Sequence, residues 1–150
     1  MEHDPNTFFS AVISAGAILS GFCGTFLAFR IQREAGYYRQ SEDKAGNLSH
    51  FTSSLLLLIL ATISSIFFGV LIPLFALADP SLGVGSVPLV VAGLVAAIVL
   101  ILGYFFNELF HYHVFKFLNN TSGEWKRERL VWIGALLAAF VAGGCAYFVL

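Results

Sequence analysis

The side chains best suited to chemistry in this 150-residue chain are one carboxylate and two imidazoles near the ends of apolar segments. Glu108 and His111 are three residues apart, so on a helix they share a face, as the Glu and His pairs of carboxylate di-iron bundles do. His50 precedes the second apolar segment and His111 follows the third. If these two imidazoles lie at the same depth, they provide axial ligands for a haem between two helices. A haem- or metal-binding redox subunit is therefore the alternative interpretation of this chain.

The chain lacks the further ligands that a metal site would need, so we rank a redox function below a non-enzymatic one. A di-iron site needs another Glu and His pair and two further carboxylates, yet no acid lies inside any apolar segment. The chain also lacks HExxH and GxSxG motifs, a Cys/His pair and a Ser/Lys dyad. We therefore assign no catalytic residue, no metal and no cofactor, and we interpret Glu108, His111 and His50 as polar residues at the membrane interface. The sequence favours a protein that is not an enzyme.

Four long apolar segments must position these side chains. They cover Thr7–Phe29, Phe51–Leu77, Val87–Asn107 and Leu130–Leu150. Each is long enough to cross a hydrocarbon core about 30 Å thick as a helix, and in lipid only helices and closed barrels satisfy their own backbone groups. The runs lack the two-residue alternation of barrel strands. With 58% hydrophobic and 11% charged residues, residues 1–150 are predicted to form one all-α domain, an integral membrane four-helix transmembrane bundle surrounded by the lipid bilayer.

The distribution of charge predicts how this bundle is oriented. All eight Lys and Arg residues lie in two short connections, 30–50 and 108–129, and short basic connections stay in the cytoplasm. The N-terminal tail and the connection between the second and third spans carry acids and no bases. We therefore expect both termini on the non-cytoplasmic side, with the spans arranged as two antiparallel helical hairpins. Compact spans and short connections favour a bacterial inner membrane, and the net charge of −1 argues against a nucleic-acid partner.

Small residues recur at helical spacing in the first and fourth spans. Predicted helix-packing residues are Gly16, Ser20, Gly24 and Ala28 with Gly21 beside them, and Gly134, Ala138 and Ala142 with Ala135, Ala139 and Gly143 beside them. Small side chains let helix backbones approach closely, which favours association where lipid removes the hydrophobic attraction between helices. Two interpretations stay open. Either these faces pack the helices of one subunit together, or a remaining face joins subunits into a homo-oligomer.

Hydroxyl side chains in the first span suggest a pore. Ser10, Ser14 and Thr25 would line a channel if an oligomer placed them around an axis. Ion-coupled transport is disfavoured, because no acid, base or histidine lies in mid-membrane. The leading expectation is a small non-enzymatic membrane protein that acts through helix association. It would work as an oligomeric channel-like protein or as an accessory subunit of a larger membrane complex.

Overall fold

The computed structural model describes residues 5–40, 48–111 and 124–149, and within these ranges every residue except Asp79 is helical. The elements are α1 (Pro5–Gln40), α2 (Leu48–Ile66), the π-helical turn η2 (Phe67–Leu71), α3 (Ile72–Ala78), α4 (Pro80–His111) and α5 (Glu124–Val149). This result confirms the predicted all-helical class.

Within the described residues, four helical stretches are long and apolar enough to cross a membrane, as predicted. They are Asn6–Arg33, Ser54–Ala78, Gly85–Leu109 and Leu130–Val149, and the second of them combines α2, η2 and α3. The helices continue past the predicted spans, because α1 extends to Gln40 and α4 extends to His111. Part of each connection predicted at 30–50 and 108–129 is therefore helical.

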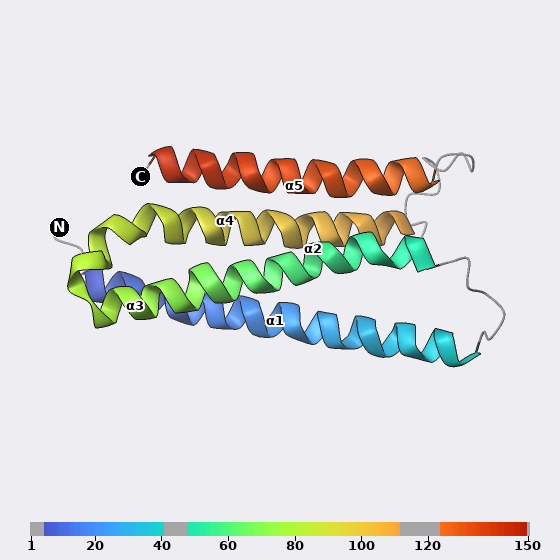
Figure 1. Ribbon diagram of the computed structural model, residues 1–150, viewed down its shortest axis with the longest axis horizontal. Helices are drawn as coiled ribbons and strands as arrows, with labels where there is room; N and C mark the ends of the chain where they lie inside the picture. The colour runs from blue at the N-terminus through green and yellow to red at the C-terminus, as the bar shows by residue number, and fades with distance from the viewer. Residues whose placement is uncertain (1–4, 41–47, 112–123, 150) are drawn as a thin grey trace.

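The long helices lie side by side in the order α1, α2, α4 and α5, and both chain termini lie at one end of the molecule (Figure 1). The α4–α5 interface is the most extensive, followed by α2–α4 and α1–α2. In the described part of the chain, α1 and α5 do not touch each other. These two helices therefore cover opposite sides of the α2–α4 pair, and each keeps a face that no other helix covers.

The core is formed by all four long helices, and apart from Tyr104 it is made of small and medium-sized side chains. Its members are Cys23, Leu57, Leu58, Ala61, Leu100, Ile101, Tyr104, Ala135 and Ala139. Lipid is as apolar as this core, so close van der Waals packing has to supply much of its stability. Small residues at the helix crossings make such packing possible.

At the crossing of α1 and η2, the two backbones are in direct contact. A Cβ added to Gly16 would lie 2.5 Å from the carbonyl oxygen of Gly69 and 2.6 Å from its Cα, so only glycine fits there. One turn further along α1, the hydroxyl of Ser20 donates to the Ser65 hydroxyl at 3.0 Å. At this crossing, direct backbone contact and the Ser20–Ser65 hydrogen bond thus hold α1 against the second span.

Proline explains the π-helical turn beside this crossing. Pro73 lies in the first turn of α3 and has no N–H with which to bond the carbonyl four residues earlier. The preceding residue, Ile72, donates its N–H to the oxygen of Phe67, five residues back. This longer bond is the defining feature of a π turn, which absorbs the proline without ending the span.

Asp79 separates α3 from α4 and caps α4. Its backbone is extended (φ −127°, ψ 99°), and Pro80 follows at the first helical position, where its missing N–H costs nothing. The Asp79 carboxylate accepts hydrogen bonds from the Ser81 N–H at 3.0 Å and from the Ser81 hydroxyl at 2.7 Å. These bonds hold the pKa of Asp79 below its ordinary value of 3.8.

Candidate functional site

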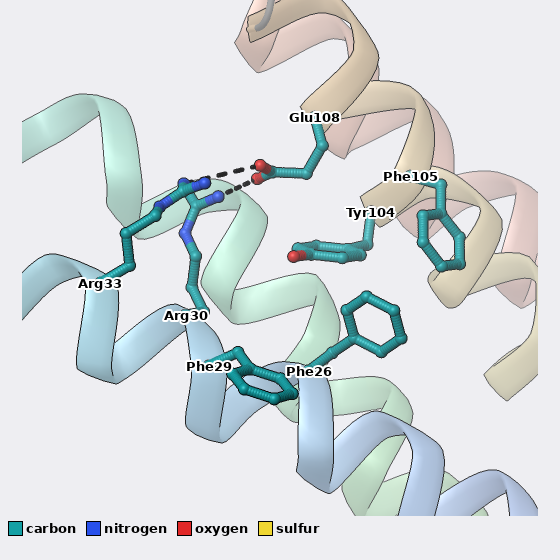
Figure 2. A pocket seen from close by; sticks show the side chains of 7 residues that line it. All are labelled: Phe26, Phe29, Arg30, Arg33, Tyr104, Phe105 and Glu108. Carbon is teal, nitrogen blue, oxygen red and sulfur yellow. Dashed lines mark ion pairs between the residues drawn. The ribbon is translucent and has the colours of Figure 1, made fainter.

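A buried ion pair joins α1 to α4 (Figure 2). The guanidinium of Arg30 contacts the carboxylate of Glu108, and their side chains are only 3% and 13% exposed. A second nitrogen of Arg30 donates to the Ser54 hydroxyl of α2 at 3.2 Å. Ions removed from water cost several kcal/mol unless they are paired and hydrogen-bonded. The pair therefore links three helices and makes their relative positions depend on one another.

Arg33 is a second cation on the same carboxylate. Its Nη2 lies 3.9 Å from Oε2 of Glu108, and its side chain is 36% exposed. Charge-assisted hydrogen bonds are about 2.7–2.9 Å long, so this contact is electrostatic attraction at a longer distance. Two guanidinium groups (+2) and one carboxylate (−1) give these three side chains a net charge of +1.

An aromatic cleft of about 270 Å³ surrounds these charges. It is lined by Phe26, Phe29, Arg30 and Arg33 of α1 and by Tyr104, Phe105 and Glu108 of α4 (Figure 2). Lining residues on each helix recur three or four positions apart, the spacing that places side chains on one helix face. The rings of Phe26 and Phe105 meet edge to face, with centroids 5.6 Å apart. The cleft therefore combines a charged rim with an aromatic interior.

The structure places Glu108 against Arg30, a pairing that sequence analysis missed. The signal was present, because Arg30 ends the first uncharged run and Glu108 immediately follows the third. Two spans that cross in the same direction bring such residues to the same depth, where opposite charges attract. Which spans are neighbours could not be read from the sequence, so the partner of Glu108 stayed undetermined.

The haem or metal alternative rested on imidazoles that lie outside the described side chains. His50 belongs to α2 and His111 is the last residue of α4, but their side chains are not among those described. Among the residues that the structure does describe, no three His, Cys, Asp or Glu side chains come together as a metal site requires. The redox alternative therefore stays a prediction.

The small residues predicted on α1 divide between two faces. Gly16 and Ser20 contact the second span, whereas a Cβ added at Gly21 or Gly24 would meet nothing within 4 Å, and Ala28 is exposed. The cause is geometric. Each four-residue step rotates the position by about 40° around an α-helix, so a series of three steps turns from the inner to the outer face.

An exposed strip of small residues, here named the α1 stripe, runs along the outer face of this helix. Its members are Ser10, Ser14, Ala17, Gly21, Thr25 and Ala28. They fall within about 100° of the helix circumference. The hydroxyls of Ser14 and Thr25 donate to the backbone oxygens four residues earlier, at 3.0 and 2.8 Å. The three candidate pore-lining residues thus share one face, with two hydroxyls already satisfied inside the helix.

The fourth span packs through one row of its small residues. Ala135 and Ala139 are buried in the core, and a Cβ added to Gly143 would approach the backbone oxygen of Ala92 in α4 at 3.1 Å. The other row points outward, because Gly134 meets nothing within 4 Å and Ala138 is exposed. Of the predicted packing residues here, Gly143 contacts α4, while Ala142 is half-buried.

Comparisons with known proteins give no further guide to these features. No protein family, curated protein or solved structure matches the chain. The function must therefore be inferred from the ion-paired cleft and from the uncovered helix faces.

Proposed function

We propose that this membrane protein is not an enzyme and acts through helix association, as a homo-oligomer whose subunits meet along the α1 stripe and form a channel-like assembly. The observation that carries this proposal is the stripe itself: small side chains along an outer face, with open space at Gly21. Small residues at a helix surface allow the close approach that drives association in lipid.

The position of α1 at one side of the molecule supports this proposal. Only 17% of its apolar window is buried, compared with 39% for the corresponding window of α4. The helix therefore has a large surface to offer a second subunit. The bulky exposed side chains Ile18 and Phe22 border the stripe on one side, where a partner helix lying on the stripe would also contact them.

The fourth span is less suited to the same role. Its outer face carries Phe140 and Phe148, which are 83% and 85% exposed. Large apolar side chains pack well against acyl chains, whereas they keep a second helix at a distance. We therefore assign subunit contact to α1 and lipid contact to the outer face of α5.

The hydroxyls of the stripe are the basis of the channel-like assignment. Ser10, Ser14 and Thr25 lie on the face that would turn toward the axis of a ring of α1 helices. Hydroxyl and backbone groups can line a pore without charged side chains. An accessory subunit of a larger complex would use the same face to bind a different protein. The flux experiment has to distinguish this role from that of a channel.

We further propose that both termini are non-cytoplasmic in a bacterial inner membrane, with the spans paired as two antiparallel hairpins. Support comes from the two basic connections and from the common position of the termini at one end (Figure 1). The charged cleft would then lie at the cytoplasmic surface.

Disulfide crosslinking in native membranes tests the proposed contact. Ala17→Cys, in the stripe, should form dimers on oxidation. Ile63→Cys, which is 58% exposed on the second span, is the matched control and should not. Both changes are made in a Cys145→Ser background, because Cys145 is exposed. Equal crosslinking at the two positions, or none at Ala17, would contradict the contact.

Flux measurements then separate a channel from an accessory subunit. Reconstituted wild-type protein should pass ions or small solutes across liposomes, and Ser14→Phe, which places a bulky side chain on the α1 stripe, should abolish this flux. Impermeable liposomes, together with a partner protein that copurifies from native membrane in fixed ratio, would replace the channel-like assignment with the accessory one.

A further inference from the structure

The aromatic cleft between α1 and α4 opens sideways from the molecule. These two helices touch less than any other pair in contact, and α2 passes behind the space between them (Figure 2). Phe29, which lines the cleft on α1, is 66% exposed. In a membrane, large apolar side chains with this exposure contact acyl chains. The opening therefore faces lipid instead of the interior of the bundle.

We propose that this cleft binds an anionic phospholipid, with the lipid phosphate at Arg33 and the upper part of its acyl chains along Phe26 and Phe29. Arg33 and Phe29 are absent from the α1 stripe, so this site and the proposed subunit contact use different parts of the helix. The site would be present in a monomer as well as in an oligomer.

The depth of the charged and aromatic groups matches the polarity of such a lipid. Arg33 and Leu109 are the last residues of their apolar spans, which places the charges at the boundary between headgroups and hydrocarbon. Phe26 lies seven residues before Arg33, or about 10 Å deeper along the helix. A phospholipid likewise has its phosphate at the boundary and its chains below.

The charge of the cleft selects an anion. The three charged side chains that line the cleft, Arg30, Arg33 and Glu108, carry two positive charges and one negative charge. The Arg33 side chain is 36% exposed and lies 3.9 Å from the carboxylate, so a phosphate can approach its guanidinium from outside while the Arg30 contact stays in place. Guanidinium groups bind phosphate through two parallel hydrogen bonds, and basic pockets between transmembrane helices suit anionic headgroups.

The size of the cleft indicates how much of the lipid it holds. Its volume of about 270 Å³ is close to the lower end of small-molecule sites, which is about 300 Å³. It can accommodate a phosphate, the glycerol and the start of the chains. The remaining chain length would lie along the exposed surfaces of α1 and α4.

Native mass spectrometry of the purified full chain tests this site. The protein is titrated with phosphatidylglycerol and with phosphatidylcholine of the same chain length, and the bound lipids are counted. Wild type should prefer phosphatidylglycerol. Arg33→Gln should reduce that preference about fivefold, which corresponds to about 1 kcal/mol for one basic group. Arg33→Lys keeps the charge and should retain most of the preference for phosphatidylglycerol. This variant tests the role of the charge even if the Gln variant folds poorly.

Arg39→Gln is the matched control. It removes the same charge from α1 six residues beyond Arg33, about 9 Å further along the helix, and should leave the preference unchanged. Equal retention of both lipids by wild type would overturn the proposal, as would equal losses in Arg33→Gln and Arg39→Gln. If glycerol phosphate without acyl chains displaces the lipid at equal concentration, the site belongs to a soluble phosphate and the lipid assignment is wrong.

Discussion

Replacing Gly16 by alanine tests whether the fold depends on backbone contact between α1 and η2. The added methyl group would lie 2.5 Å from the oxygen of Gly69 and 2.6 Å from its Cα. Carbon atoms in good contact are about 3.5–4.0 Å apart, so α1 would have to move outward by about 1 Å. The obstacle is backbone, which cannot turn aside as a flexible side chain could. The same movement would lengthen the Ser20–Ser65 hydrogen bond, now 3.0 Å.

The expected magnitude follows from two opposing effects. Overpacking of a close contact costs about 1–3 kcal/mol, whereas alanine in place of glycine inside a helix contributes about 0.5–1 kcal/mol of stability. Gly16→Ala should therefore lower the free energy of unfolding by about 1–2 kcal/mol. Gly21→Ala is the matched control on the same helix. Its methyl group would meet nothing within 4 Å, so only the favourable effect remains.

Unfolding in mixed micelles of dodecyl sulfate and a mild detergent measures both variants. Helix content from circular dichroism and the midpoint of the transition give the free energy of unfolding. Gly16→Ala should unfold at a lower dodecyl sulfate fraction than wild type, and Gly21→Ala should not. Equal stability of the two variants would refute the argument, because it would mean that α1 does not approach η2 this closely.

Three further sets of variants test other contacts by the same measurement. Arg30→Met and Glu108→Leu should each lower the free energy of unfolding by about 3 kcal/mol, because each leaves a buried charge without its main partner. The double variant should have nearly the stability of wild type. If the two losses add in the double variant, the ion pair is contradicted. Asp79 has a lowered pKa, so its ionised form stabilises the protein above pH 3.8, and this contribution disappears as pH falls through the lower folded-state pKa. The stability difference between wild type and Asp79→Ala should therefore shrink on acidification; a constant difference would contradict the cap. Gly103→Ala should weaken the α4–α5 contact, since its methyl group would overlap a Cβ of α5, whereas Gly134→Ala meets open space; equal effects would contradict that packing.

Apolar length made the four membrane-crossing helices predictable. A span must satisfy its backbone and cover the hydrocarbon thickness, so composition alone locates it within a few residues. The first predicted span, Thr7–Phe29, corresponds to an apolar helix at Asn6–Arg33. The extra turn contains Arg30 and Arg33, which the sequence places in a connection because charge normally marks the end of a span. Pairing of Arg30 with Glu108 is what allows that charge to lie within the helix bundle.

The faces of the helices were harder to predict than their positions. In the fourth span, Gly134 and Ala138 lie one position before Ala135 and Ala139, and a single position corresponds to about 100° of rotation. Both rows are small and apolar, so composition cannot tell which one packs against α4. On α1 the gradual rotation of a four-residue repeat moves Gly16 inward and Ala28 outward. Deciding these faces requires knowing which helices are neighbours.

The most direct test of helix association through the α1 stripe is the mass of the complex extracted from native membrane in a mild copolymer. We predict a closed homo-oligomer for wild type and a monomer for Gly21→Leu. Gly21 is exposed and a Cβ added there meets nothing within 4 Å, so the Gly21→Leu subunit should still fold, but the bulk of leucine would separate α1 helices in the assembly. A wild-type monomer, or an oligomer of unchanged mass in Gly21→Leu, would contradict the account.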